Sequence, residues 1–345
     1  MTDLTDKAKI LNKLLAKFPR TNLGHYPTPI EPMPNLGAVL GIDLAVKRDD
    51  CTGVGFGGNK VRQLEFYLGK SQAELADTIL ITGAVQSNFV RIAAAMARRL
   101  GMDCHIQLED RVATKSDLYH ENGNVLLDKI LGATLHSFPD GEDEVGADAA
   151  LTQHANQLRE AGNRPFVIPL GPDHPPLGAL GYVAAALELA QQISQNPWSP
   201  DRIFIGSGSA LSHVGLLYGL RALGIEIPVV GVCVRRDAEA QTVRVSKRLG
   251  DLAAMLGGHC SASLIDIEVD DAALSPGYGQ LSKSAKEAIQ LAAMCEGLFL
   301  DPIYTAKTLA ALIDQARKGQ LRGERILFWH TGGQPALFGY ADQLP

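Results

Sequence analysis

The chain has 345 residues and a mass of 36.9 kDa, which favours two domains of ordinary size over one. Hydrophobic residues make up 46% and charged residues 20%, so the chain can build a large core, and a disordered or fibrous class is excluded. The net charge is −6 and no long run of either sign occurs, which argues against a nucleic-acid or anionic-membrane partner.

The cysteines and the termini indicate a reduced intracellular protein. The five cysteines are odd in number and scattered, without a C-x-x-C pair, so we expect neither a disulfide framework nor a metal centre. The N-terminal residues lack the apolar region of a signal peptide, and no stretch approaches the roughly 20 apolar residues of a membrane span. We therefore predict a soluble, cytoplasmic protein.

Short β-rich runs alternate with long segments rich in alanine and leucine. The predicted strands are 43–48, 78–82, 104–108, 165–170, 202–206, 227–234 and 325–330. The predicted helices are 88–100, 123–131, 177–194, 212–223, 238–256, 282–296 and 306–318. The strands are almost continuously apolar, which indicates burial on both faces and hence parallel sheets between helices. This alternation predicts an α/β fold.

Two segments rich in glycine and proline, 52–58 and 169–181, interrupt the pattern. We predict a small α/β domain, 63–175, inserted into a large domain made of 1–62 and 176–345. The acidic stretch 139–150 is expected to be a solvated surface loop.

A lysine follows a glycine pair at the expected start of a helix, in the segment 57–60 (GGNK). Most lysines are exposed, and on frequency alone Lys60 is one of them. An ammonium near the positive end of a helix is destabilised, however, so its pKa is expected to fall and the free amine becomes available. A lysine that bonds covalently to a carbonyl group needs this property.

Three strand-to-helix junctions could bind a ligand, because open parallel sheets bind ligands beyond the carboxyl ends of their strands. The junction 205–212 (IGSGSALS) suits a phosphate, although an ordinary serine-capped helix explains it equally well. The turn 83–88 (GAVQSN) could hold a carboxylate, although helix capping alone is the commoner reason for such a turn. The segment 329–333 (WHTGG) admits a flat ligand or is simply a tight turn.

These motifs occur together in one family. The sequence resembles the pyridoxal-phosphate (PLP) enzymes of the tryptophan-synthase-β fold, fold type II. Within them it is similar to the branch holding D-cysteine desulfhydrase, L-cysteate sulfo-lyase and 1-aminocyclopropane-1-carboxylate (ACC) deaminase. The resemblance covers about residues 18–340. It rests on YPTPIEPMPNL (26–36), KRDDCTG (47–53), GGNKVRQLEF (57–66), GAVQSN (83–88), NGNVLLD (122–128), GALGY (178–182), LDPIYTAK (300–307) and HTGG (330–333). KRDDCTG is most similar to the cysteate sulfo-lyases.

The resemblance implies two domains with open, mostly parallel sheets flanked by helices, and PLP as cofactor. The implied catalytic residues are Lys60, which would hold the cofactor and move the Cα proton, Ser87, Tyr278 and Tyr304. The implied cofactor-binding residues are Asn59, Lys60, Ser207, Gly208, Ser209, Ala210, Leu211, Ser212 and Thr331. The implied substrate-binding residues are Gln86, Ser87, Asn88 and Thr305. The family pattern also implies a homodimer.

Some positions depart from the family pattern. Leu211 and Ala306 stand where relatives carry glycine, so we expect a reshaped phosphate loop, because a Cβ in the left-handed region costs about 1 kcal/mol. Phe89 replaces a histidine beside the carboxylate site. Thr305 and Thr331 replace an acid and an aliphatic residue of ACC deaminases, which favours a sulfur-releasing lyase.

The sequence therefore predicts PLP-dependent β-elimination from a small sulfur-containing amino acid, giving pyruvate, ammonia and sulfide or sulfite. An ACC deaminase-like or other amino-acid deaminase on the same fold is the alternative. A rival of another class is an NAD(P)-linked oxidoreductase, against which Leu211 counts in the GSGS loop. A non-catalytic binding relative is the third alternative.

Overall fold

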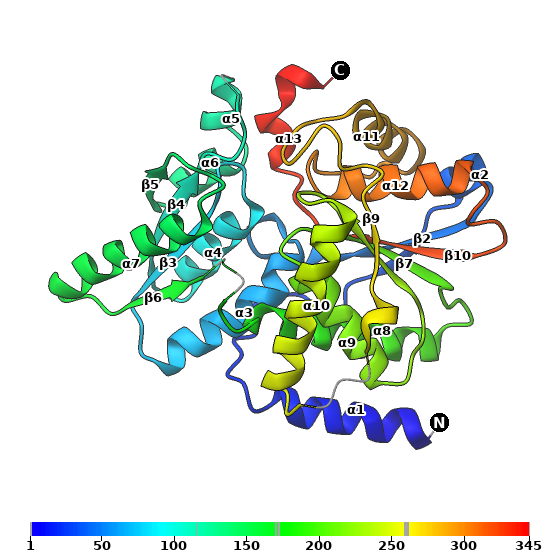
Figure 1. Cartoon of the computed structure of the whole chain (residues 1–345), viewed down its shortest axis with the longest axis horizontal. Helices are drawn as coiled ribbons and strands as arrows, with labels where there is room; N and C mark the ends of the chain where they lie inside the picture. Colours follow the sequence, from blue (N-terminus) through cyan, green and yellow to red (C-terminus); the bar gives the residue numbers. More distant parts are fainter. Residues whose placement is uncertain (1, 115, 170, 172, 259–261, 345) are drawn as a thin grey trace.

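The computed structural model describes residues 2–114, 116–169, 171, 173–258 and 262–344. Two sheets, each lying between helices, make up the molecule (Figure 1). The α/β fold with mostly parallel sheets, predicted from the sequence, is thus confirmed. Within the described part of the chain, no helix has the length and apolar character needed to cross a membrane.

The larger sheet has six strands. In spatial order they are β1 (Ile30–Pro32), β2 (Asp43–Arg48), β10 (Arg325–His330), β7 (Arg202–Ser207), β8 (Val229–Cys233) and β9 (Glu268–Asp270). Only the edge pair β1 and β2 is antiparallel, and every other neighbouring pair in this sheet runs parallel. The carboxyl ends of β7, β8 and β10 therefore meet at one edge of the sheet.

Helices cover both faces of the larger sheet, because its strands alternate apolar side chains between two cores. One core contains Ile203, Ile205 and Trp329, and the other contains Phe204 and Phe328. The helices of the first core are α1 (Thr2–Leu15), α8 (Leu180–Gln195), α9 (Leu211–Ala222) and α10 (Ala238–Met255). The helices of the second core are α2 (Pro34–Leu40), α11 (Lys283–Glu296) and α12 (Thr305–Arg317).

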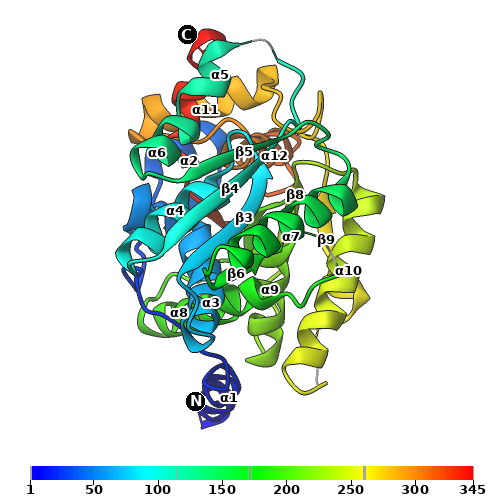
Figure 2. The ribbon, with the colours of Figure 1, turned by 90° about the vertical axis from the view of Figure 1, so that its left-hand side faces the viewer.

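The smaller sheet is entirely parallel. Its strands, in spatial order, are β5 (Thr134–Phe138), β4 (Asp103–Glu109), β3 (Thr78–Ala84) and β6 (Pro165–Ile168), seen side by side in Figure 2. Its core joins β3 and β4 to α3 (Asn59–Ala73) and α4 (Asn88–Arg99), while α7 (Glu144–Glu160) packs on the opposite face through Leu151 and Ala155 against Leu80.

The remaining elements are short. They are α5 (Asp117–Glu121), α6 (Asn124–Ile130), α13 (Ala336–Gly339) and the 3₁₀ turns Asp49–Cys51, Val54–Phe56, Leu177–Ala179, Leu264–Asp266 and Ala341–Gln343. α6 packs beside α4, and α13 packs beside α5.

All seven predicted strands are present, but β1, β5 and β9 were not predicted. These three have few buried residues, so they lack the continuous apolar run that marks the others. Residues 170 and 172, within the predicted 165–170 strand and the 169–181 break, lie outside the described residues, as does Cys260.

The division into 63–175 and 1–62 plus 176–345 stays a prediction. All four strands of the smaller sheet lie within 63–175. Helix α3 runs without a break across the predicted boundary at residue 62, so this helix connects the two sheets.

Candidate active site

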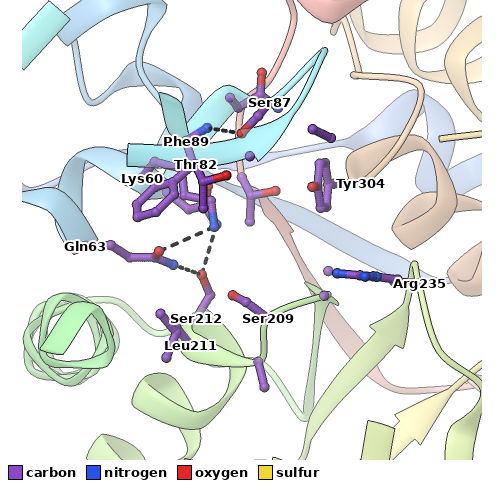
Figure 3. A pocket seen from close by; sticks show the side chains of 18 of the residues that line it. Lys60, Gln63, Thr82, Ser87, Phe89, Ser209, Leu211, Ser212, Arg235 and Tyr304 are labelled. Atoms are coloured by element: carbon purple, nitrogen blue, oxygen red, sulfur yellow. Dashed lines mark hydrogen bonds between the residues drawn. The ribbon is translucent and has the colours of Figure 1, made fainter. Parts of the chain in front are cut away.

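One pocket lies between the two sheets, where strands of both end. It is lined by residues that directly follow or end β3, β7, β8 and β10, and by the first turns of α3, α4 and α9 (Figure 3). Because the carboxyl ends of parallel strands are the usual ligand sites of α/β proteins, this pocket is the candidate active site.

Lys60 is the second residue of α3, and its side chain faces the pocket. Its Nζ donates to Oε1 of Gln63 at 3.3 Å and lies 5.3 Å from the centre of the Phe89 ring. Burial lowers the pKa of Lys60 to about 8, because a buried ammonium is poorly solvated. The free amine is therefore much more accessible than that of an ordinary lysine.

The loop after β7 leads into α9 and lies next to Lys60 (Figure 3). Gly208, Ser209, Ala210 and Ser212 all line the pocket at this helix start. The left-handed position of this loop, expected at Leu211, falls one residue earlier. Ala210 takes the left-handed conformation, with φ of 73°, and Leu211 begins the helix with its side chain buried.

Two side chains of α3 hold this loop beside Lys60. Ser212 Oγ accepts hydrogen bonds from Asn59 Nδ2 at 2.9 Å and from Gln63 Nε2 at 2.8 Å. The same Gln63 therefore contacts both the lysine and the loop, and Gln63 was not among the site residues predicted from the sequence.

Ser207 does not reach the pocket wall. Its hydroxyl lies behind the loop, 2.8 Å from Nε2 of Gln241 and 3.3 Å from Nδ1 of His213. The Ser207 hydroxyl therefore supports the loop through His213 and Gln241. The family resemblance had implied that Ser207 contacts the cofactor.

The first turn of α4 forms another wall. Ser87 caps the helix, and its Oγ accepts from the backbone N–H groups of Phe89 and Val90 at 3.2 and 3.5 Å. Asn88 is fixed by Arg91 and Asn124, which donate to its Oδ1 at 3.1 and 3.0 Å. Both Ser87 and Asn88 line the pocket, at the positive end of the helix.

Gln86 and Thr305, predicted to bind substrate, lie outside the pocket lining. Gln86 donates to the backbone oxygens of Tyr119 and Asn122 at 2.6 and 2.9 Å, so its amide fixes the chain before α6. Thr305 Oγ1 lies 2.7 Å from Oδ1 of Asp301. Both polar groups are fully occupied by these buried contacts.

Tyr278 and Tyr304 lie together on the pocket wall, with their hydroxyl oxygens 2.8 Å apart. Burial, followed by the neighbouring Tyr278, raises the pKa of Tyr304 well above its usual value. The Tyr304 hydroxyl therefore stays protonated and can serve as a hydrogen-bond donor to a bound group. Thr331, after β10, lines the same pocket.

Charged residues on the pocket wall were missed. Arg111, Arg235, Arg236, Arg244, Arg248 and Glu144 all line it. The acidic stretch 139–150 was expected to be a surface loop, but Glu144 begins α7 and forms ion pairs with arginines of the pocket. The adjacent arginines 235 and 236 after a strand were the only sequence signal. His174 also lines the pocket, where it contacts Asp148 at 3.2 Å.

The residues present fit PLP. An amine with a pKa of about 8 suits covalent attachment of an aldehyde. The small residues at the start of α9 give a phosphate group access to backbone N–H groups and to the positive helix end. A β-carbon added at Gly208 would lie 3.2 Å from Val234, so this part of the loop is already closely packed.

The fold and the lysine-centred pocket are those of the PLP-dependent enzymes. Residues 21–332 match the family model described as "Pyridoxal-phosphate dependent enzyme", and the chain belongs to this family. Among its relatives are D-cysteine desulfhydrases of Salmonella choleraesuis and Salmonella paratyphi C, each 40% identical over 327 residues, 94% of this chain and 97% of the relative.

Solved structures agree with this assignment. The structure of an "ACC deaminase homologue" is 36% identical, covers 96% of this chain and 97% of its own, and has a TM-score of 0.85. Diaminopropionate ammonia lyase of Escherichia coli, 16% identical with a TM-score of 0.67 over 98% of this chain and 90% of its own, shares the fold. The chain is thus a PLP enzyme similar to desulfhydrases and deaminases.

Proposed function

We propose that this enzyme eliminates the β-substituent of a small sulfur-containing amino acid and releases pyruvate, ammonia and sulfide or sulfite. The Lys60 amine, which lies in one pocket with the loop at the start of α9, carries the proposal. Near full-length similarity to D-cysteine desulfhydrases supports a sulfur-containing substrate.

Lys60 would hold the cofactor, with Ser209, Ala210 and Ser212 around its phosphate and Thr331 near its ring. When bound, PLP draws electrons away from the substrate Cα–H bond and so makes that proton acidic. Lys60, as a free amine of lowered pKa, is suited to remove that proton.

The substrate carboxylate would bind at the start of α4, where Ser87 and Asn88 line the pocket. Arg91 and Asn124 would keep the Asn88 amide in place. Tyr278 and Tyr304 would face the departing group, and their hydroxyl groups, which are hydrogen-bonded to each other, would donate hydrogen bonds to it. The electron pair left by the Cα proton forms a double bond between Cα and Cβ, and the sulfur group leaves with the C–S electron pair as sulfide or sulfite. Water then replaces the amino nitrogen to give pyruvate and ammonia.

The experiment is pyruvate release from D-cysteine, L-cysteine and L-cysteate by the PLP-loaded enzyme. We expect release from at least one of them, and loss of more than about 1,000-fold in kcat for Lys60→Ala, because covalent attachment and proton transfer are both removed. Lys70→Ala is the matched control, since Lys70 is an exposed lysine of the same helix. Release of a four-carbon keto acid from ACC, without pyruvate from any sulfur amino acid, would support the deaminase alternative instead.

We also propose that the enzyme acts in the cytoplasm as a homodimer and binds no nucleic acid. The net charge of −6 supports the absence of a nucleic-acid surface. Large exposed apolar side chains, Met294, Phe299 and Phe338, support association between copies. Light scattering at micromolar concentration measures this directly, and a mass of one chain would contradict it.

A further inference from the structure

Three arginines of the pocket share one carboxylate. Arg235 and Arg236 follow β8, and Arg244 lies on α10. Glu144 Oε1 accepts from Arg235 and Arg236 at 3.0 Å each, and its Oε2 accepts from Arg244 at 3.3 Å. Arg235 has a second partner in Glu142, whose side chain is 78% exposed. Three positive charges therefore face one carboxylate inside the pocket.

The other two arginines of the pocket have partners outside the Glu144 cluster. Arg111 pairs with Glu109, with Nε 2.9 Å from the carboxylate oxygen. Arg248 donates to the backbone oxygens of Gly171 and His174 at 2.7 and 2.6 Å. Arg248 is thus directed to these backbone oxygens and stays charged, and the arginines that share the single carboxylate of Glu144 are Arg235, Arg236 and Arg244.

The guanidinium groups of these three arginines are poorly solvated. The side chains of Arg235, Arg236 and Arg244 are only 11%, 19% and 12% exposed. Burial, and then the charges of Arg244 and Arg235, lower the pKa of Arg236 to about 10. Crowded cations with too little counter-charge attract an anion.

The position of the arginines identifies which anion they suit. In the proposed function, the substrate carboxylate binds at the start of α4 and the cofactor phosphate at the start of α9. Arg235 lies on a third side of the pocket, with Tyr304, across from Lys60 and Gln63 (Figure 3). A third acidic group would therefore come from the reacting side of the substrate. Guanidinium groups bind such oxyanions in two-point contacts.

We propose that Arg235, Arg236 and Arg244 form a subsite for an acidic group on the substrate β-carbon, such as a sulfonate, and that Glu144 competes with that group for these arginines. This inference rests on the proposed function and names its substrate class. An uncharged thiol gains nothing from the subsite, so the arginines discriminate between β-sulfonated and thiol amino acids.

The rival occupant is the cofactor phosphate, because Arg236 Nη1 lies 3.4 Å from the backbone oxygen of Gly208 in the phosphate loop. Arg244 donates to Glu144, whereas Arg236 contacts the loop, so the substitution of Arg244 is the test of the subsite. Glu142→Gln is the matched control for Glu144→Gln, since Glu142 pairs with Arg235 from the same segment but is exposed.

The experiment measures KM and kcat of the PLP-loaded wild type and of Arg244→Gln, Glu144→Gln and Glu142→Gln, with L-cysteate and with D- and L-cysteine. Bound cofactor is measured by its absorbance. We expect Arg244→Gln to raise KM for L-cysteate about tenfold, the usual effect of losing a hydrogen bond to a charged group. Glu144→Gln should lower that KM several-fold, and Glu142→Gln should leave it unchanged. KM for the thiols and cofactor content should not change in any variant.

Equal changes with sulfonate and thiols, loss of cofactor from Arg244→Gln, or turnover of thiols without turnover of L-cysteate would overturn the subsite. If no substrate reacts, the proposed function fails, and inorganic sulfate then tests the subsite alone. Sulfate that raises the thermal unfolding midpoint of the wild-type holoenzyme, but not of Arg244→Gln, supports the subsite, and equal or absent shifts refute it.

Discussion

His213 shows how one buried residue links the pocket to stability. It lies on α9, and its Nε2 is 3.1 Å from the backbone oxygen of Val229 while its Nδ1 is 3.3 Å from Ser207 Oγ. A β-carbon at Gly231 would lie 2.2 Å from His213 Nδ1, so only glycine leaves room for the ring. The imidazole therefore packs against the phosphate loop in a buried space, where its neutral form is favoured over the charged form.

Acid should destabilise the protein through His213. Burial lowers its pKa to about 4 from 6.5. Between these pH values the unfolded chain binds a proton at His213 and the folded chain does not, so stability is complete above pH 6.5 and is lost as pH falls towards 4. The loss from this residue is about 3 kcal/mol. Urea unfolding at pH 7.5 and pH 4.5 measures it.

The comparison is with His213→Gln, which should lose less stability than the wild type over the same pH interval. His120→Gln is the control. His120 is exposed, so this substitution should leave the pH dependence of unfolding as it is in the wild type. An equal pH dependence in the wild type and His213→Gln would refute this role of His213.

At the same scale, the sequence predicted Lys60 but only part of its chemistry. The helix start was visible in the GGNK segment, but the burial of the Lys60 side chain was not. Phe89 could be identified as a departure from the family, yet its place 5.3 Å from the lysine amine required the structure. The left-handed residue of the loop was also predicted one position too late, at Leu211, whereas it is Ala210.

At the scale of elements, hydrogen bonds connect α12 to the loop that contains Tyr278. Lys307 of α12 is fully buried, and its Nζ donates to the backbone oxygens of Leu274 and Gly277 at 2.7 and 2.6 Å. Tyr304 caps the same helix and contacts Tyr278. Lys307 therefore helps to set the distance between the two tyrosines.

Lys307→Met should remove both hydrogen bonds and lower stability by about 2 kcal/mol, because two buried carbonyl groups lose their donor. It should also lower kcat for pyruvate release while cofactor binding stays unchanged, since Tyr278 loses its fixed position. Lys318→Met, at the exposed end of α12, is the control. A kcat equal to that of the wild type would show that Lys307 does not position the tyrosine.

Also at this scale, sequence patterns identified buried elements and failed for those of mixed polarity. The apolar strands such as 43–48 and 325–330 were predicted with the bounds they have. Helix α7 was missed because its first turn is acidic and its buried face is narrow, with Ala147, Leu151 and Ala155 buried. Glu144 looked like surface because its three arginine partners lie about 90–100 residues away.

At the scale of the whole molecule, the site exists only because strand ends of both sheets meet at one pocket. α3 brings Lys60 and Gln63, the larger sheet brings the loop before α9, and the smaller sheet brings Ser87 and Asn88 at the start of α4. The sequence could give the parallel strands and hence the edge at which a ligand binds. It could not give which side chains turn towards that edge, as Gln86 and Thr305 show.

The family resemblance supplied what residue patterns alone left open. The loop 205–212 was compatible with a phosphate site or a plain helix cap, and its place beside Lys60 in the pocket now favours the phosphate. Neither the residue patterns nor the family resemblance predicted the arginine subsite. Its charged residues come from α7, α10 and the segment after β8, which are far apart in the sequence.

The most direct test of the account is the covalent attachment of the cofactor. The purified enzyme is incubated with PLP, reduced with borohydride, digested and analysed by mass spectrometry. We predict one modified peptide, with the cofactor on Lys60, and none in Lys60→Ala. An unmodified Lys60, or cofactor fixed on another lysine, would contradict the account.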